Sequence, residues 1–184
     1  MAKITIFGMA GTGKTSTGKG VAQLIGYKFF SGGDFMRETA KKMGITLMEL
    51  EELSKHEDKY DIERDKIIAE FGRTHDNFIV EARLAWHFIP DSFKICFLCD
   101  FNKRTERIAK REKKDVEVVR EETRARERSI YDRFEKYYGI KDFEDKKHFD
   151  MIIDTGTMSL QKVIETIIKE LEEKKIINDI QREK

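Results

Sequence analysis

The residues best suited to chemistry lie near the start of the chain, in a glycine-rich segment that ends in lysine and threonine. Residues 8–15 read Gly-Met-Ala-Gly-Thr-Gly-Lys-Thr and satisfy the pattern Gly-x4-Gly-Lys-Ser/Thr in full. The glycines let the backbone curl, so that successive N–H groups point at phosphate oxygens. Lys14 supplies a charge for the β- and γ-phosphates, and the Thr15 hydroxyl is suited to ligate Mg²⁺. The segment therefore predicts a nucleoside triphosphate site. Its expected contacts are Gly8, Met9, Ala10, Gly11, Thr12, Gly13, Lys14, Thr15 and Ser16.

A triphosphate site alone does not define a function, because motors, GTPases and kinases all use one. A GTPase would need the guanine-reading pattern Asn-Lys-x-Asp, but Asn102-Lys103 is followed by Arg and Thr. With 184 residues the chain is also short for a remodelling ATPase. These observations favour a kinase of a small molecule, with ATP and Mg²⁺ as cofactors.

Charged residues that follow predicted strands form the second group. An anionic acceptor and a triphosphate repel each other, so several cations are needed to bring them together. Arg37 and Arg83 each follow a strand and can reach the ligand edge of the sheet, where a guanidinium can donate two parallel hydrogen bonds to a phosphate. The alternatives without a role in binding are a solvated helix residue for Arg37 and an ion pair with Glu81 for Arg83. Glu81 closes its strand, where an acid can hold Mg²⁺ through water, orient Arg83 or contact the acceptor. We take Glu81, with Thr15, as a candidate metal residue.

The third group is a charged stretch of twelve bases and eight acids between residues 103 and 133. Arg104, Arg107 and Arg111 share one helical face, and Arg126 and Arg133 share another. Two such faces could meet over the transferring phosphoryl group, so Lys14, Arg107, Arg126 and Arg133 are the candidate catalytic residues. The alternative without a catalytic role is a charged helical hairpin stabilised by ion pairs. An RNA-binding helix is disfavoured by the interspersed acids and the lack of aromatic stacking residues.

Alternating strand and helix patterns would position these residues. Short apolar runs predict strands at 3–7, 27–30, 77–80, 93–98 and 149–153. Helices are expected over 14–25, 34–43, 46–72, 102–138 and 159–177, and residues 178–184 are expected to fray. This alternation predicts an α/β fold of the P-loop NTPase type, a three-layer sandwich around a five-stranded parallel sheet. We expect a single domain over residues 1–177.

An ordered set of segments resembles the nucleoside monophosphate kinases, most closely the archaeal-type cytidylate kinases. The segments are Ser31–Arg37, Val80–Trp86, Arg104–Arg111, Arg126–Arg133 with Tyr138–Ile140, and Phe149–Thr155. The resemblance implies phosphoryl transfer from ATP to a nucleoside monophosphate, with CMP or dCMP as the first candidates. It implies a helical acceptor flap near 34–72 and an arginine lid near 102–138. Ala82 stands where family members usually have glycine.

The same resemblance implies an acceptor site made of Gly33, Asp34, Arg37, Arg83 and one flap acid. Eight acids and three bases lie between Glu49 and Asp65, a composition that also fits a solvated helical face. Asp61 and Asp65 lie on one helical face, and either could accept a hydrogen bond from the exocyclic amine of cytosine. We take Asp61 as the candidate. Two alternatives stay open, namely a kinase of a sugar or shikimate-like acid and a non-catalytic nucleotide- or RNA-associated module.

Composition excludes several other classes. Lys+Arg 36 against Asp+Glu 35 gives a net charge of +1, which is poor for a nucleic-acid coat or a polybasic membrane binder. No apolar run approaches membrane-spanning length, and the N-terminal segment lacks the features of a signal peptide. Cys96 and Cys99 cannot form a disulfide framework, and residues three apart on a strand point to opposite faces and cannot share a metal. We expect a cytoplasmic monomer that acts on small-molecule nucleotides and contacts no membrane.

Overall fold

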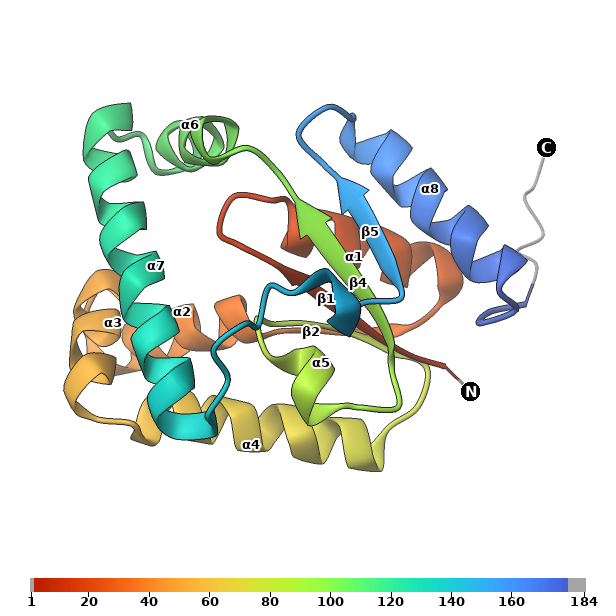
Figure 1. Ribbon diagram of the computed structural model, residues 1–184, viewed down its shortest axis with the longest axis horizontal. Coiled ribbons are helices and arrows are strands. Elements are labelled where there is room, and N and C mark those ends of the chain that lie inside the picture. Colours follow the sequence, from red (N-terminus) through yellow and green to blue (C-terminus); the bar gives the residue numbers. More distant parts are fainter. Residues whose placement is uncertain (1, 179–184) are drawn as a thin grey trace.

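The computed structural model describes residues 2–178 as one parallel sheet with helices on both faces (Figure 1). The sheet runs in the order β2-β3-β1-β4-β5 and every neighbouring pair is parallel. Its strands are β1 Lys3–Gly8, β2 Lys28–Ser31, β3 Phe78–Glu81, β4 Phe93–Leu98 and β5 Met151–Asp154. This confirms the predicted five-stranded sheet. The predicted fifth strand begins two residues early, because the short turn η1 (Lys146–His148) delivers the chain to an extended Phe149 before pairing starts.

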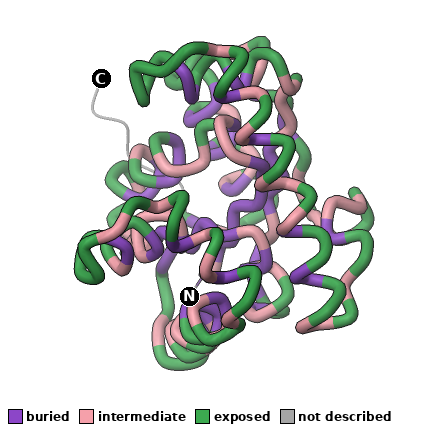
Figure 2. Tube along the Cα trace, turned by 90° about the vertical axis from the view of Figure 1, so that its left-hand side faces the viewer, coloured by how far each residue is buried: buried purple, intermediate pink, exposed green. Residues whose placement is uncertain are grey.

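Apolar side chains alternate between the two faces of the sheet and so create two helical layers. Ile4 and Ile6 face α1 (Lys14–Ile25) and α8 (Leu160–Glu173), where Val21 and Ile167 pack against them. Phe7 faces the opposite side and packs near Ile130 of α7 (Val116–Tyr138). On that side the sheet is also covered by α4 (Lys59–Thr74) and by α5 (Ala85–Phe88), a short helix that the sequence pattern did not predict. Buried residues run through the interior and exposed residues cover the outer helices (Figure 2).

We call α2 (Gly32–Met43), α3 (Leu47–His56) and α4 the flap, because they cover the segment that the sequence predicts as an acceptor flap. The predicted continuous helix over 46–72 is wrong, because the chain turns at Glu57 and Asp58 between α3 and α4. Glu57 is extended, with φ −121° and ψ 106°. Neither glycine nor proline marks this break. Helix α2 begins two residues earlier than expected because the Ser31 hydroxyl accepts a hydrogen bond from the Asp34 N–H and caps it.

We call α6 (Phe101–Glu112) and α7 the lid, after the predicted arginine lid. The predicted helical stretch over 102–138 is a hairpin of these two helices. Lys113 ends α6 in the left-handed conformation, with φ 55°, and Asp115 caps α7 by accepting from the N–H groups of Glu117 and Val118. Figure 1 shows α7 running from α6 past α3 towards the start of α4. The lid therefore lies directly against the flap.

Helix α8 is shorter than the predicted 159–177, because residues 174–177 form a turn and a bend after Glu173. The expectation that the tail frays concerns residues 178–184, and 179–184 lie outside the described residues. In the described part of the chain no helix combines the length and the apolar character needed to cross a membrane.

Candidate active site

The glycine-rich loop joins β1 to α1, as the sequence predicted. Gly11 and Gly13 have φ angles of 83° and 88°, a conformation that favours glycine. A Cβ on Gly11 would lie 2.5 Å from the backbone oxygen of Arg104 in α6, whereas one on Gly13 would meet nothing within 4 Å. The loop therefore passes so close to the lid that residue 11 must lack a side chain.

Contacts from outside the loop and within it hold its carbonyl groups. The Arg104 guanidinium donates to the Ala10 carbonyl at 3.0 Å, and the Thr155 hydroxyl donates to the Thr12 carbonyl at 2.8 Å. The Met9 carbonyl accepts from the Thr12 hydroxyl and from the Lys14 ammonium. With these carbonyls engaged, the loop and the N-terminus of α1 present amide groups to an anion.

A cavity of about 160 Å³ opens in front of the loop, between the flap and the lid. It brings together predicted residues from four separate segments: the loop, the start of α2, the end of β3 and, through Arg126, helix α7. Six basic side chains line it against two acidic ones, so it favours an anion. The charged lining residues are Lys14, Arg37, Arg64, Arg83, Arg111, Arg126, Glu51 and Glu81.

Lys14, Thr15 and Glu81 meet at the base of this cavity. Burial lowers the pKa of Lys14 to about 8, and the positive charges of Arg83 and Arg126 act in the same direction while Glu81 opposes them. Glu81 Oε1 accepts hydrogen bonds from Thr15 Oγ1 at 2.9 Å and from the Ser31 hydroxyl. Glu81 Oε2 has no hydrogen-bond partner among the described residues.

This donor set fits Mg²⁺, which keeps several waters and binds proteins through one carboxylate or two together with phosphate oxygens. Residues 2–178 contain no cluster of three or more His, Cys, Asp or Glu side chains that could hold a metal alone. A cation here would therefore depend on the phosphates for its remaining ligands.

Three arginines line the cavity from α2, from α4 and from the segment after β3. Arg83 follows β3, and its Nε is buried without a hydrogen-bond partner among the described residues. Burial and the nearby Arg126 lower the pKa of Arg83 to about 10, so it stays charged at neutral pH. Arg37 is 46% exposed and donates to Asp34 at 2.6 Å. Gly33 and Arg37 line the cavity as expected, whereas Asp34 lies beside them and pairs with Arg37 and Lys19. Arg64 is the third cation, and the sequence did not single it out.

The lid arginines divide differently from the prediction. Arg126 and Arg111 line the cavity. Arg107 instead extends over the loop, where it donates to the Thr155 carbonyl at 2.8 Å and lies 3.5 Å from the Gly11 carbonyl. Arg133 is buried and faces the flap rather than the cavity, because two flap carboxylates hold it.

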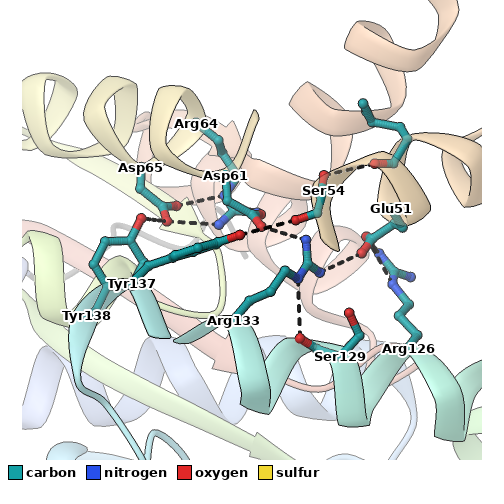
Figure 3. Close-up of polar contacts among 11 residues, drawn as sticks. Glu51, Ser54, Asp61, Arg64, Asp65, Arg126, Ser129, Arg133, Tyr137 and Tyr138 are labelled. Carbon is teal, nitrogen blue, oxygen red and sulfur yellow. Dashed lines mark hydrogen bonds and ion pairs between the residues drawn. The ribbon is translucent and has the colours of Figure 1, made fainter. Parts of the chain in front are cut away.

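Buried ion pairs connect α3, α4 and α7 behind the cavity (Figure 3). Asp61 Oδ1 accepts from Arg64 Nη1 at 2.8 Å, and Asp61 Oδ2 accepts from Arg133 Nη1 at 2.5 Å. Asp65 holds Arg64 from the other side and accepts from the Tyr138 hydroxyl at 2.7 Å. The structure therefore does not bring Asp61 to the cavity, because both its oxygens engage arginines.

Glu51 completes the network and was missed by sequence reasoning, which grouped it with solvated acids. It accepts from Arg126 and Arg133 (Figure 3). Burial alone would raise the pKa of Glu51, but Arg126, Arg83 and Arg133 lower it to about 2. The only signal available in the sequence was its place among many acids opposite a basic stretch.

The fold and site define a class of P-loop kinases. The shikimate kinase from Acinetobacter baumannii matches with a TM-score of 0.65 and 15% identity, covering 96% of each chain, which shows a common fold. The model of the cytidylate kinase-like family matches residues 3–157. The cytidylate kinase of Archaeoglobus fulgidus is 38% identical over 95% of this chain and 97% of its own, and that of Methanothermobacter thermautotrophicus is 36% identical over 83% and 94%.

The chain belongs to the cytidylate kinase-like family. This confirms the resemblance in the sequence, and it makes the protein an enzyme of the nucleoside monophosphate kinase class.

Proposed function

We propose that the protein transfers the γ-phosphoryl group of ATP to CMP or dCMP, giving ADP and the nucleoside diphosphate. An oxygen of the acceptor phosphate attacks the γ-phosphorus, and the bond from that phosphorus to the β–γ bridging oxygen breaks. The observation that carries this proposal is that the triphosphate loop lines the same cavity as Arg37, Arg64 and Arg83. The acceptor is already an anion, so no catalytic base is needed and catalysis reduces to positioning and charge neutralisation.

Each group has a role that follows from its position. The loop residues 8–16 and Lys14 hold the donor phosphates, while Arg83 and Arg37 bind the acceptor phosphate through their guanidinium groups. Arg126 neutralises charge on the transferring group, and Arg111 lies at the same cavity wall. Arg107 is proposed to steady the loop from the donor side, since it reaches the carbonyls of Thr155 and Gly11.

Thr15 and Glu81 are the residues that would hold Mg²⁺ with the donor phosphates. Bound there, the ion would neutralise part of the negative charge on the donor phosphates. The Glu81 carboxylate already orients the Thr15 and Ser31 hydroxyls towards the same point, so this corner is organised before ligand enters.

The base assignment rests on the relatives, several of which are named cytidylate kinases and are 33–38% identical to this chain. The likeness to shikimate kinase is one of fold at 15% identity and does not favour shikimate as the acceptor. Asp61 is not proposed as the reader of the base, because it positions Arg64 and Arg133.

The test is ADP release with ATP and Mg²⁺ against CMP, dCMP, UMP, AMP, GMP, dTMP and shikimate. We expect turnover with CMP or dCMP that exceeds the other acceptors by at least about tenfold. Turnover with a different monophosphate would replace the base assignment and retain the chemistry. ATP binding without turnover of any acceptor would overturn the proposal.

A further inference from the structure

Glu51 places a negative charge where a substrate phosphate would be expected to bind. Among the described residues only Glu51 and Glu81 bring a carboxylate to the cavity wall, and Glu81 is engaged by the Thr15 and Ser31 hydroxyls. Glu51 Oε1 accepts from Arg126 Nε at 3.1 Å and from Arg126 Nη2 at 2.5 Å. Its other oxygen, Oε2, accepts from Arg133 Nη2 at 2.9 Å. One oxygen of the carboxylate thus accepts from both neighbouring donors of Arg126, donors that could bind a phosphate instead.

The two arginines held by Glu51 are not equivalent. Arg133 is 6% exposed and has further partners in Asp61 and the Ser129 carbonyl. Arg126 is 32% exposed, lines the cavity, and has no hydrogen-bond partner other than Glu51 among the described residues. Arg126 can therefore leave Glu51 for another anion, while Arg133 stays in place.

The free-energy cost of moving Arg126 away from Glu51 is limited, because Arg133 stays in place. A buried charge that loses its partner is strongly destabilising, but Glu51 would keep Arg133 through Oε2. A phosphate carries more negative charge than a carboxylate and repels Glu51, so both effects favour transfer of Arg126 to the phosphate. The contact also joins α3 to α7 across the cavity. At about 160 Å³, this cavity is smaller than the usual binding site for a small molecule, which spans about 300–1,000 Å³.

We propose that Glu51 is an internal stand-in for substrate phosphate, which holds Arg126 and links flap to lid in the free protein and releases Arg126 when a phosphate enters. The inference rests on the proposed phosphate-binding role of the cavity. Glu51 acts here as a positioning residue through Arg126. The stand-in opposes premature binding of anions and makes movement of the lid depend on the arrival of phosphate.

The test measures binding of inorganic tripolyphosphate by calorimetry, so that it does not depend on which acceptor is phosphorylated. Glu51→Gln keeps the shape and removes the charge, and we expect tripolyphosphate to bind about tenfold more tightly. Glu52→Gln is the matched control, because it makes the same change of net charge at the adjacent, exposed position that pairs with Lys55. Equal affinities in the two variants, or weaker binding in Glu51→Gln, would overturn the proposal.

Two further measurements separate the stand-in from a structural role. In an Arg126→Met background the tightening caused by Glu51→Gln should be much smaller, because only the direct repulsion between Glu51 and the phosphate is then removed. An effect that came from lost packing would be the same in both backgrounds. In the unmodified protein, the ¹⁵Nε signal of Arg126 should shift on addition of tripolyphosphate while that of Arg133 stays. A fixed Arg126 signal would contradict the exchange even if Glu51→Gln failed to fold. These measurements use tripolyphosphate and no acceptor nucleotide, so they can still be interpreted if the protein does not phosphorylate CMP.

Discussion

At the scale of single residues, the two arginines predicted to bind the acceptor differ in how far the protein prepares them. Arg83 has a buried Nε without a partner, so it can bind a phosphate without first giving up a contact. Arg37 is half exposed and must leave Asp34. A charged hydrogen bond is worth about 1.5–3 kcal/mol, and each 1.4 kcal/mol is about tenfold in rate. Arg83→Met should therefore lower kcat/KM for the acceptor about 100-fold and Arg37→Ala about tenfold.

Steady-state kinetics with each substrate varied in turn checks this order. Both variants should raise the KM of the acceptor and leave ATP affinity nearly unchanged. Arg73→Ala is a suitable control, because Arg73 lies exposed on α4, outside the cavity lining, and pairs with Glu70. An unchanged acceptor KM in both variants would remove Arg37 and Arg83 from the acceptor site.

At the same scale, the pKa of Lys14 should make ATP binding depend on pH. Burial lowers its pKa to about 8, and a bound polyanion favours the charged form and raises that pKa again. Between pH 8 and 9 the free ammonium is partly deprotonated, so binding must take up a proton and affinity falls as the pH rises. At pH 8.5 we expect an uptake of roughly 0.8 proton per ATP. Calorimetry in two buffers of different ionisation enthalpy measures it, and the same uptake in Lys14→Met would refute the assignment.

At the scale of elements, buried ion pairs fasten α4 to α7. Asp61 is 3% exposed and serves Arg64 and Arg133 together, so its loss leaves two buried cations short of a partner. Breaking a buried pair on one side costs about 3–5 kcal/mol. Asp61→Asn should therefore lower the free energy of unfolding in urea by about 3 kcal/mol. Asp58→Asn, at an exposed position three residues earlier, should change it by less than about 0.5 kcal/mol. If Asp61→Asn lowered the free energy of unfolding no more than Asp58→Asn does, the network would add no stability.

The elements also show what the sequence could predict. The strands follow from short apolar runs, and the loop follows from residue types at fixed spacing, so sheet, loop, Arg37 and Arg83 were within reach. The break at Glu57 was not, because no glycine or proline marks it. Arg133 shares a helical face with Arg126, yet Asp61 on another helix captures it. Glu51 and Arg64 were missed for the same reason, since only tertiary packing decides which members of a charged stretch meet.

At the scale of the whole molecule, the chain divides into two parts held by different forces. The sheet with α1 and α8 is joined by a continuous apolar cluster that includes Ile6, Val21 and Ile167. Flap and lid meet largely through charged and polar contacts, such as Arg126 with Glu51 and Tyr138 with Asp65. A net charge of +1 conceals this division, because the cavity concentrates six basic side chains against two acids. In the free protein Glu51 offsets part of the mutual repulsion of those cations by pairing with Arg126, and bound phosphates would offset more of it.

Ligand binding should therefore slow amide exchange unevenly. With ATP and CMP bound, phosphate neutralises the cations, and opening of the flap and lid then requires loss of ligand as well. Peptides from α3 and α7 should exchange at least about tenfold more slowly in hydrogen–deuterium exchange measured by mass spectrometry, while those from α8 change less than about twofold. In Asp61→Asn the protection of α3 and α7 should fall together, because Arg133 joins Asp61 to Glu51. Equal slowing throughout would mean that the molecule opens only as a whole, and no change in α3 and α7 would separate flap and lid from the ligand site.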